Sequence, residues 1–223
     1  MAGALVVLEG VEGAGKTTQV ARLVARLQRG GVAVQTFREP GGTPLGDAVR
    51  QLLLDPGGDV VPEAEALLFF ASRAQLVARA IAPALARGHV VVLDRFFLST
   101  YAYQIAGRGL DATLIRDANR LATGGVRPDV TCVLDLAVAD GLARAGRRSH
   151  ADRLEAAGDA FHARVAAAFA ASLTPAWQQQ HPETGPVVRV AADGTPDDVE
   201  ARLAAVVAGR VPALAPALAR ADA

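Results

Sequence analysis

The stretch Ala4-Leu-Val-Val-Leu-Glu-Gly-Val-Glu-Gly-Ala-Gly-Lys-Thr-Thr18 joins an apolar run to a glycine-rich loop and a helical segment. Gly10 to Thr17 fits the pattern G-x-x-x-x-G-K-[ST] of a phosphate-binding loop (P-loop), in the strand–loop–helix context that this pattern requires. Glycines at 10, 13 and 15 allow a tight turn whose N–H groups point inward. With the N-terminus of the next helix, these groups form a nest for phosphate. The stretch therefore predicts a P-loop within an α/β fold.

The rest of the chain alternates short β-branched runs with longer stretches rich in Ala and Leu. The runs predict strands at 4–8, 32–37, 89–93, 130–134 and 187–190. The longer stretches predict helices near 16–29, 45–53, 63–87, 98–106, 112–122, 139–145, 159–180 and 196–208. Continuous apolar strands are typical of a parallel sheet that is covered on both faces. We therefore predict one P-loop NTPase domain over residues 1–210, with a doubly wound, five-stranded parallel sheet and helices on both faces.

Two segments depart from this alternation. Residues 146–154, Gly-Arg-Arg-Ser-His-Ala-Asp-Arg-Leu, are polar and basic, and we predict that they form a short mobile lid. Residues 211–223 are an Ala/Pro tail without evident capping residues, which predicts a poorly ordered end.

Composition limits the possible partners. Acidic and basic residues number 23 each, and this zero net charge argues against an electrostatic grip on nucleic acid or on an anionic membrane. The single cysteine, Cys132, excludes an internal disulfide framework and a four-cysteine metal site, and its apolar surroundings predict a buried thiol. The apolar stretch near the N-terminus is too short for a membrane span or a signal peptide, so we expect a cytoplasmic protein.

The basic residues contain one further signal. The 23 basic residues comprise 22 arginines and one lysine, Lys16, which falls inside the P-loop motif. A compact ammonium on a flexible stem differs in shape from a planar guanidinium. We therefore interpret Lys16 as a residue that is required for its shape as well as for its charge.

The motif assigns roles to its own residues. Lys16 is predicted to reach the β- and γ-phosphates of ATP, and the Thr17 hydroxyl is predicted to bind Mg²⁺. The predicted ATP-binding set is Gly10, Val11, Glu12, Gly13, Ala14, Gly15, Lys16, Thr17 and Thr18. A P-loop does not specify the reaction, because kinases, motors, switches and DNA-handling ATPases all use it.

Three further groups of residues have the chemistry of a second substrate site. Arg38 follows the second predicted strand, where α/β folds bind ligands, and offers bidentate donors for a phosphate; an exposed surface arginine is the alternative. Phe69 and Arg73 share a helix face and can stack a base and read its edge, although spacing alone favours a core Phe and a snorkelling Arg. Asp94 and Arg95 end the third strand, where a carboxylate suits Mg²⁺ or its waters.

In these motifs the chain resembles the bacterial thymidylate kinases that have a basic lid. The matching pieces run from Glu9-Gly-Val-Glu-Gly-Ala-Gly-Lys-Thr-Thr18 through Arg38-Glu-Pro-Gly-Gly-Thr43 and Asp94-Arg95-Phe96 to the arginines of 144–153. Phe96 departs from the family, which more often has Tyr or His there. The resemblance implies transfer of the γ-phosphate of ATP to dTMP with Mg²⁺, by a homodimer. The alternatives are another P-loop nucleotide or nucleoside kinase, or a P-loop ATPase switch.

The resemblance also implies residue roles. Arg38 holds the acceptor phosphate, Phe69 stacks on thymine and Arg73 contacts an exocyclic oxygen. The full dTMP-binding set is Glu12, Arg38, Phe69, Arg73, Arg95, Ser99, Thr100, Tyr103 and Gln104. The predicted catalytic residues are Lys16, Arg95, Arg147, Arg148 and Arg153, with Arg144 beside the adenine. The predicted metal set is Thr17, Asp94 and, through water, Glu9.

Overall fold

The sheet of the protein is entirely parallel. The computed structural model describes residues 3–137, 140–141 and 153–221. Five strands lie side by side in the order β2-β3-β1-β4-β5, and each neighbouring pair is parallel. They are β1 (Ala4–Glu9), β2 (Val34–Arg38), β3 (Val90–Asp94), β4 (Val130–Asp135) and β5 (Val187–Ala191). The predicted five-stranded parallel sheet is confirmed.

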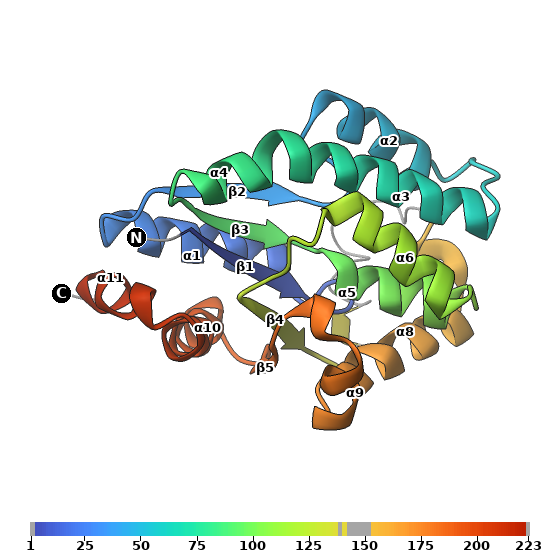
Figure 1. Cartoon of the computed structure of the whole chain (residues 1–223). Helices are drawn as coiled ribbons and strands as arrows, with labels where there is room; N and C mark the ends of the chain where they lie inside the picture. The colour runs from blue at the N-terminus through green and yellow to red at the C-terminus, as the bar shows by residue number, and fades with distance from the viewer. Residues whose placement is uncertain (1–2, 138–139, 142–152, 222–223) are drawn as a thin grey trace.

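Helices cover both faces of this sheet (Figure 1). Even-numbered residues of β1, such as Val6 and Leu8, pack with α1 (Lys16–Arg29) and α10 (Pro196–Arg210). Odd-numbered residues, such as Leu5 and Val7, pack in the second core. That core contains α3 (Pro62–Leu76), α6 (Ala112–Thr123) and α8 (Asp159–Ser172). The alternation of side chains along one strand thus builds two separate cores.

Two predicted helices contain π-helical segments. The stretch predicted at 63–87 is α3, a π-segment η1 (Val77–Ile81) and α4 (Ala82–Ala86). Pro83 in α4 has no N–H to donate, which interrupts the α-helical hydrogen bonds at this point. The helix predicted at 98–106 begins as α5 (Phe97–Thr100) and continues as a π-helix, η2 (Tyr101–Gly107). Single π-turns are frequent at functional sites.

The helix predicted at 159–180 is two helices. After α8, the chain turns at Thr174 into α9 (Pro175–Gln180). The Thr174 hydroxyl accepts a hydrogen bond from the N–H of Trp177, and Pro175 occupies the first turn, so this is a capped new start. The helix α2 (Pro44–Leu54) starts in the same way, with Thr43 as its cap. Of the helix predicted at 139–145, the structure describes only Asp140 and Gly141, which are helical.

Residues 211–223 were predicted to be poorly ordered, and for residues 211–221, the part that the structure describes, this prediction was wrong. Pro212–Leu214 form a 3₁₀ turn, and α11 (Ala215–Arg220) packs beside α1. Leu214 and Leu218 are buried in the same core as α1 and α10. The Arg220 guanidinium also donates to the carbonyl oxygen of Gly30 at 2.8 Å. Leucines four residues apart make one apolar face, and burial of that face orders the segment.

One helical stretch among the described residues, Pro62–Ala86, is long and apolar enough to cross a membrane. It holds the charged residues Glu65 and Arg73, both buried inside the protein, and it packs on α2 and α6. We therefore interpret it as a core helix. Cys132 is buried in β4, as predicted, and burial raises the pKa of its thiol to about 12.

Candidate active site

The P-loop lies between β1 and α1, with its glycines in conformations that other residues rarely adopt. Gly10 and Gly13 have φ of 138° and 72°. A Cβ on Gly10 would lie 2.6 Å from the Leu134 carbonyl oxygen, and one on Gly13 would lie 1.9 Å from that of Gly141. The loop is therefore tightly confined by the end of β4 and by the chain that follows it.

Lys16 lies inside this loop. Its Nζ donates to the carbonyl oxygens of Gly10 at 3.0 Å and Val11 at 2.8 Å, and the residue is 6% exposed. Burial lowers the pKa of Lys16 to about 8, and the positive charge of Arg95 adds to this effect. The ammonium is thus held at the mouth of the nest where a phosphate would bind.

Thr17 and Asp94 lie next to each other at the ends of α1 and β3. The Thr17 Oγ1 donates to Asp94 Oδ2 at 2.9 Å. Among the described residues, no three His, Cys, Asp or Glu side chains are placed to share a metal ion. Mg²⁺ is usually held by one or two carboxylates with phosphate oxygens and water, so one hydroxyl and one carboxylate beside a phosphate nest fit this ion. The predicted pair Thr17 and Asp94 is therefore compatible with Mg²⁺.

Glu9 is a different case, and its predicted metal role is not supported. The residue is fully buried, and its Oε1 accepts hydrogen bonds from the backbone N–H groups of Phe96 at 2.8 Å and Ser99 at 3.0 Å. Its Oε2 accepts from Ser99 Oγ at 2.6 Å. Burial raises the pKa of Glu9, although Arg95 and these hydrogen bonds oppose the rise. Glu9 thus ties the end of β1 to the start of α5.

Arg95 connects the P-loop to η2. Its backbone has φ of 69°, which is uncommon for a residue other than glycine. Its Nη1 donates to Gly10 O at 3.1 Å and Ser99 Oγ at 2.9 Å, and its Nη2 donates to Glu12 Oε2 at 2.7 Å and Tyr103 Oη at 3.2 Å. The unusual backbone directs the guanidinium across the site.

Glu12 is paired with this guanidinium. Burial by itself would raise the pKa of Glu12, but the charges of Arg95 and Lys16 outweigh it and hold the pKa below its usual value. Glu12 is therefore a carboxylate that faces two cations from within the phosphate loop.

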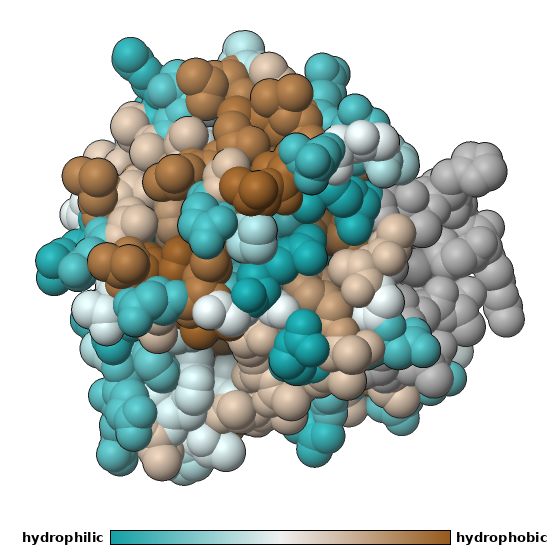
Figure 2. All heavy atoms as spheres, turned by 90° about the vertical axis from the view of Figure 1, so that its right-hand side faces the viewer, coloured by the Kyte–Doolittle hydropathy of each residue, from teal (hydrophilic) through white to brown (hydrophobic). Residues whose placement is uncertain are grey.

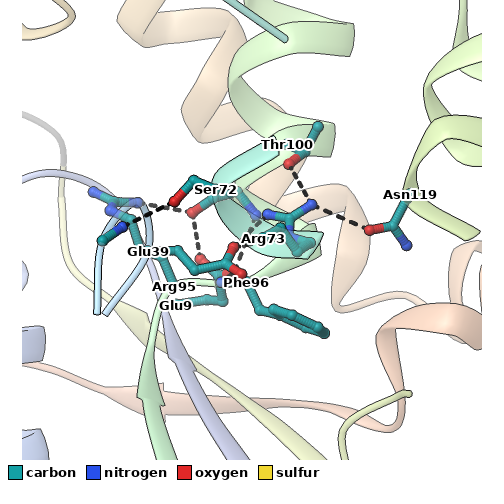
Figure 3. A network of polar contacts seen from close by, with 10 residues as sticks. Glu9, Glu39, Ser72, Arg73, Arg95, Phe96, Thr100 and Asn119 are labelled. Atoms are coloured by element: carbon teal, nitrogen blue, oxygen red, sulfur yellow. Dashed lines mark hydrogen bonds and ion pairs between the residues drawn. The ribbon is translucent and has the colours of Figure 1, made fainter. Parts of the chain in front are cut away.

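A second network surrounds Arg73 (Figure 3). The residue is 1% exposed. Its Nε and Nη2 donate to Glu39 Oε2 at 2.8 and 2.6 Å, and its Nη1 donates to Thr100 Oγ1 and Asn119 Oδ1, both at 3.1 Å. The guanidinium lies 5.1 Å from the centre of the Phe96 ring. Burial raises the pKa of Glu39, although Arg73 opposes this. Phe96, where the family more often has a polar side chain, thus packs against a buried cation.

Two adjoining cavities surround these networks. The first extends from Glu12 to Tyr103 and Gln104 in the middle of η2, and the second covers the P-loop and the end of β2. Four residues line both cavities: Glu12, Glu39, Arg50 and Arg95. Of the predicted acceptor residues, the first cavity contains Phe69, Arg73, Ser99, Thr100, Tyr103 and Gln104. Arg38 lines the second cavity and is exposed. Of the predicted ATP-binding set, the second cavity contains Glu12, Gly13, Gly15, Lys16 and Thr17, whereas Gly10, Val11, Ala14 and Thr18 line neither cavity. The shared lining residues join the two cavities at Glu12 and Arg95.

The predicted lid arginines are only partly accounted for. Arg144, Arg147 and Arg148 lie outside the described residues. Arg153 lies away from the P-loop: its Nε donates to the carbonyl oxygen of Leu53 at 3.1 Å, and its Nη2 lies 2.7 Å from Glu65 Oε2. These contacts do not support the catalytic role predicted for Arg153.

Sequence reasoning missed several lining residues, namely Glu39, Pro40, Arg50, Leu54, Leu154 and His162. It also missed Asn119, which supports Arg73. The sequence did point to Glu39, because it lies inside the motif at 38–43. It pointed less strongly to Asn119, a polar residue four positions after Ile115 and therefore on the buried face of α6.

Comparisons with known proteins identify the family. The family model for thymidylate kinase matches residues 8–180. A thymidylate kinase of Deinococcus radiodurans is 54% identical over 167 residues, which are 75% of this chain and 81% of that protein. One from a Synechococcus strain is 52% identical over 207 residues, which are 93% of this chain and 95% of that protein.

Solved structures agree. The crystal structure of thymidylate kinase from Ehrlichia chaffeensis matches with a TM-score of 0.69 and 28% identity, covering 92% of this chain and 97% of that one. The predicted family and the predicted P-loop NTPase fold are thus confirmed. The chain belongs to the thymidylate kinase family of ATP-dependent nucleoside-monophosphate kinases.

Proposed function

We propose that this enzyme transfers the γ-phosphate of ATP to dTMP, giving ADP and dTDP, with the P-loop as the donor site and the cavity around Arg73 as the acceptor site. The observation that carries this assignment is the continuity of the two cavities through Glu12, Glu39, Arg50 and Arg95. Two bound nucleotides in such a space would have their phosphates side by side, which is the arrangement that in-line transfer requires.

The donor side rests on the P-loop. Its inward N–H groups would hold the β-phosphate, and Lys16 would leave the loop carbonyls to bridge β- and γ-oxygens. Thr17 and Asp94 are the residues that would hold Mg²⁺. When bound, Mg²⁺ supplies charge neutralisation to the phosphates. Arg147 and Arg148 remain our proposal for the lid donors, with Arg144 at the adenine.

The acceptor base would meet two complementary polar groups. Arg73 has five N–H donors, and protein groups use four of them, which leaves one on Nη2 without a partner among the described residues. Gln104 is 1% exposed and lines the same cavity. A donor from Arg73 suits the O4 of thymine, and the carbonyl oxygen of Gln104 suits its N3–H. Phe69 would stack on the ring.

The acceptor phosphate needs cations but no general base. A phosphomonoester has its second pKa near about 6, so at pH 7 its oxygen is already a nucleophile. Arg38, Arg50 and Arg95 line the space between the base cavity and the P-loop and would hold this dianion. Glu12, through its 2.7 Å contact with Arg95, would keep that guanidinium in place.

The proposal predicts that dTMP is preferred over dCMP, dGMP and dAMP by well over about tenfold in kcat/KM, because a site with fixed hydrogen-bonding groups strongly rejects mismatched partners. ADP release with each monophosphate is the measurement. A different nucleotide kinase would favour another acceptor, and a P-loop switch would release ADP without any acceptor. Either result contradicts the assignment.

We also propose that the enzyme is a homodimer that associates through the exposed leucines of α3 and α6. Leu67, Leu114 and Leu121 are 65%, 70% and 86% exposed, and Figure 2 shows apolar side chains gathered on one face. Apolar patches of this kind mark interaction surfaces.

Sedimentation equilibrium is expected to show twice the chain mass of 23.0 kDa, and Leu121→Arg is expected to shift the protein to the monomer. A charge placed at an apolar interface must lose its hydration there. Ala205→Arg, exposed on α10 across the sheet, is the matched control and should remain dimeric. A parent protein that sediments as a monomer contradicts the proposal.

A further inference from the structure

Glu65 of α3 lies behind the acceptor cavity and collects contacts from three separate parts of the chain. It is fully buried. Its Oε1 accepts from Gln104 Nε2 at 2.8 Å. Its Oε2 lies 3.0 Å from Arg108 Nη2 and 2.7 Å from Arg153 Nη2. Two guanidinium groups thus accompany one buried carboxylate, and one neutral amide completes its shell.

This contact decides which way the Gln104 amide points. A carboxylate paired with two guanidinium groups can only accept hydrogen bonds, so the NH₂ group of Gln104 must face it. The carbonyl oxygen then lies on the other side of the amide, toward the cavity that Gln104 lines. Gln104 is 1% exposed, yet no described protein group donates a hydrogen bond to that oxygen. A buried acceptor without a protein partner is expected to meet a donor on a ligand.

We propose that Glu65 is a positioning residue that fixes the Gln104 amide with its carbonyl oxygen toward the acceptor base, and so selects thymine over cytosine. This inference rests on the proposed function and adds a cause for its base preference. Glu65 does not contact the base itself; it acts through Gln104.

The selection follows from the hydrogen-bonding edges of the two bases. Thymine presents an acceptor at O4 and a donor at N3, whereas cytosine presents a donor at N4 and an acceptor at N3. The free N–H of Arg73 and the fixed oxygen of Gln104 match thymine at both positions. Rotation of the Gln104 amide by 180° would place a donor toward N3, which suits cytosine and leaves a mismatch with thymine.

The test is Glu65→Gln. An amide at position 65 can offer either an oxygen or an N–H to Gln104, so it no longer fixes one orientation. We expect the ratio of kcat/KM for dTMP to that for dCMP to fall by about tenfold or more, since a mispaired buried group typically costs this much. The loss for dTMP should appear mainly in KM, with kcat at saturation little changed, because the phosphate residues are untouched.

Two further variants separate positioning from a structural role. Arg108→Gln removes a partner of Glu65 but keeps the contact with Gln104, so it is expected to lower the melting temperature and leave the dTMP/dCMP ratio within about twofold of the parent. The exchange Glu65→Gln with Gln104→Glu places an acceptor-only carboxylate toward N3–H and keeps the buried charge. It is expected to restore the ratio to within about threefold of the parent.

The outcomes are distinct. A folded Glu65→Gln enzyme with an unchanged dTMP/dCMP ratio overturns the proposal. If Glu65→Gln does not fold, the exchange variant decides: a ratio that favours dTMP as in the parent supports the proposal, and a ratio at least about tenfold lower overturns it. Arg108→Gln with the same loss of selectivity as Glu65→Gln also overturns it. A parent enzyme that does not prefer dTMP contradicts the proposed function instead, and that measurement is made first.

Discussion

Lys16→Arg is expected to give a folded protein whose kcat is lower by at least about 10²-fold, because misplacing a reacting group by about 1 Å can cost that much. Arginine serves at the other 22 basic positions of the chain, so composition alone would place it here as well. At pH 7 a lysine with a pKa of about 8 is mostly charged, and arginine always is. The substitution therefore changes shape and leaves charge almost constant.

The geometry of the P-loop gives the reason. The Lys16 ammonium donates to Gly10 O and Val11 O from a position that is 6% exposed. The loop cannot widen toward β4, because the backbone of Leu134 and Gly141 already lies against Gly10 and Gly13. A guanidinium is broader and planar, and its donors are fixed in one plane. It would have to displace either the loop or the γ-phosphate from its line with the acceptor.

Turnover at saturating ATP, Mg²⁺ and dTMP measures the effect, and a thermal melt checks that the variant is folded. Arg22→Lys is the matched control, since it makes the reverse exchange at a half-buried position of the same helix, where Arg22 pairs with Glu200 of α10 outside both cavities, and it should retain parent activity. A folded Lys16→Arg enzyme within about threefold of the parent rate would show that charge alone suffices at this position.

Local sequence patterns predicted the sheet and the position of the P-loop between β1 and α1. The three inner strands, β3, β1 and β4, are runs of apolar residues buried almost throughout, so their prediction does not depend on knowing their neighbours. The P-loop is likewise local, because its glycines, Lys16 and Thr17 are consecutive and their geometry follows from the turn. Asp94 could be predicted because β1 and β3 are parallel and end together.

The cavity around Arg73 could not be predicted from the sequence pattern alone. Its central pairs join residues that are far apart in the sequence, such as Arg73 with Glu39 and Asn119, at separations of 34 and 46 residues. Spacing favoured a snorkelling Arg73 on the surface, and only the family resemblance placed it in a site. The guanidinium is in fact buried, because Glu39 compensates its charge.

The contacts of Arg153 and the packing of residues 211–221 differ from the sequence predictions for a similar reason. Arg153 was grouped with its basic neighbours in the sequence, but a buried carboxylate on α3 determines where it lies. The tail was judged by its Ala and Pro content, whereas the spacing of Leu214 and Leu218 carried the signal for packing. In both cases contacts with residues far away in the sequence outweighed the local composition.

Arg73→Met is expected to destabilise the protein by about 3–5 kcal/mol and to abolish the preference for dTMP, because it leaves the Glu39 carboxylate buried without its cation. Glu39 is 5% exposed, and its Oε1 has no hydrogen-bond partner among the described residues, so Arg73 supplies its main compensation. Urea unfolding measures the free-energy change. Kinetics with dTMP and dCMP measure the preference.

Adding Glu39→Gln to Arg73→Met separates the loss of stability from the loss of the preference for dTMP. The neutral amide removes the uncompensated charge, so we expect at least about 1–2 kcal/mol of stability to return while the preference for dTMP stays lost.

The pH dependence of the stability should also show that the Glu39 carboxylate causes the loss. The pKa of Glu39 is already raised by burial, and loss of Arg73 should raise it further. A carboxyl whose pKa is higher in the folded state stabilises that state when protonated, and this stability is lost as pH rises through the folded pKa. The deficit of Arg73→Met should therefore be smaller at pH 5 than at pH 8, and nearly independent of pH in the double variant. If Arg73→Met loses the same free energy of unfolding at pH 5 as at pH 8, the buried charge of Glu39 is not the cause of the loss.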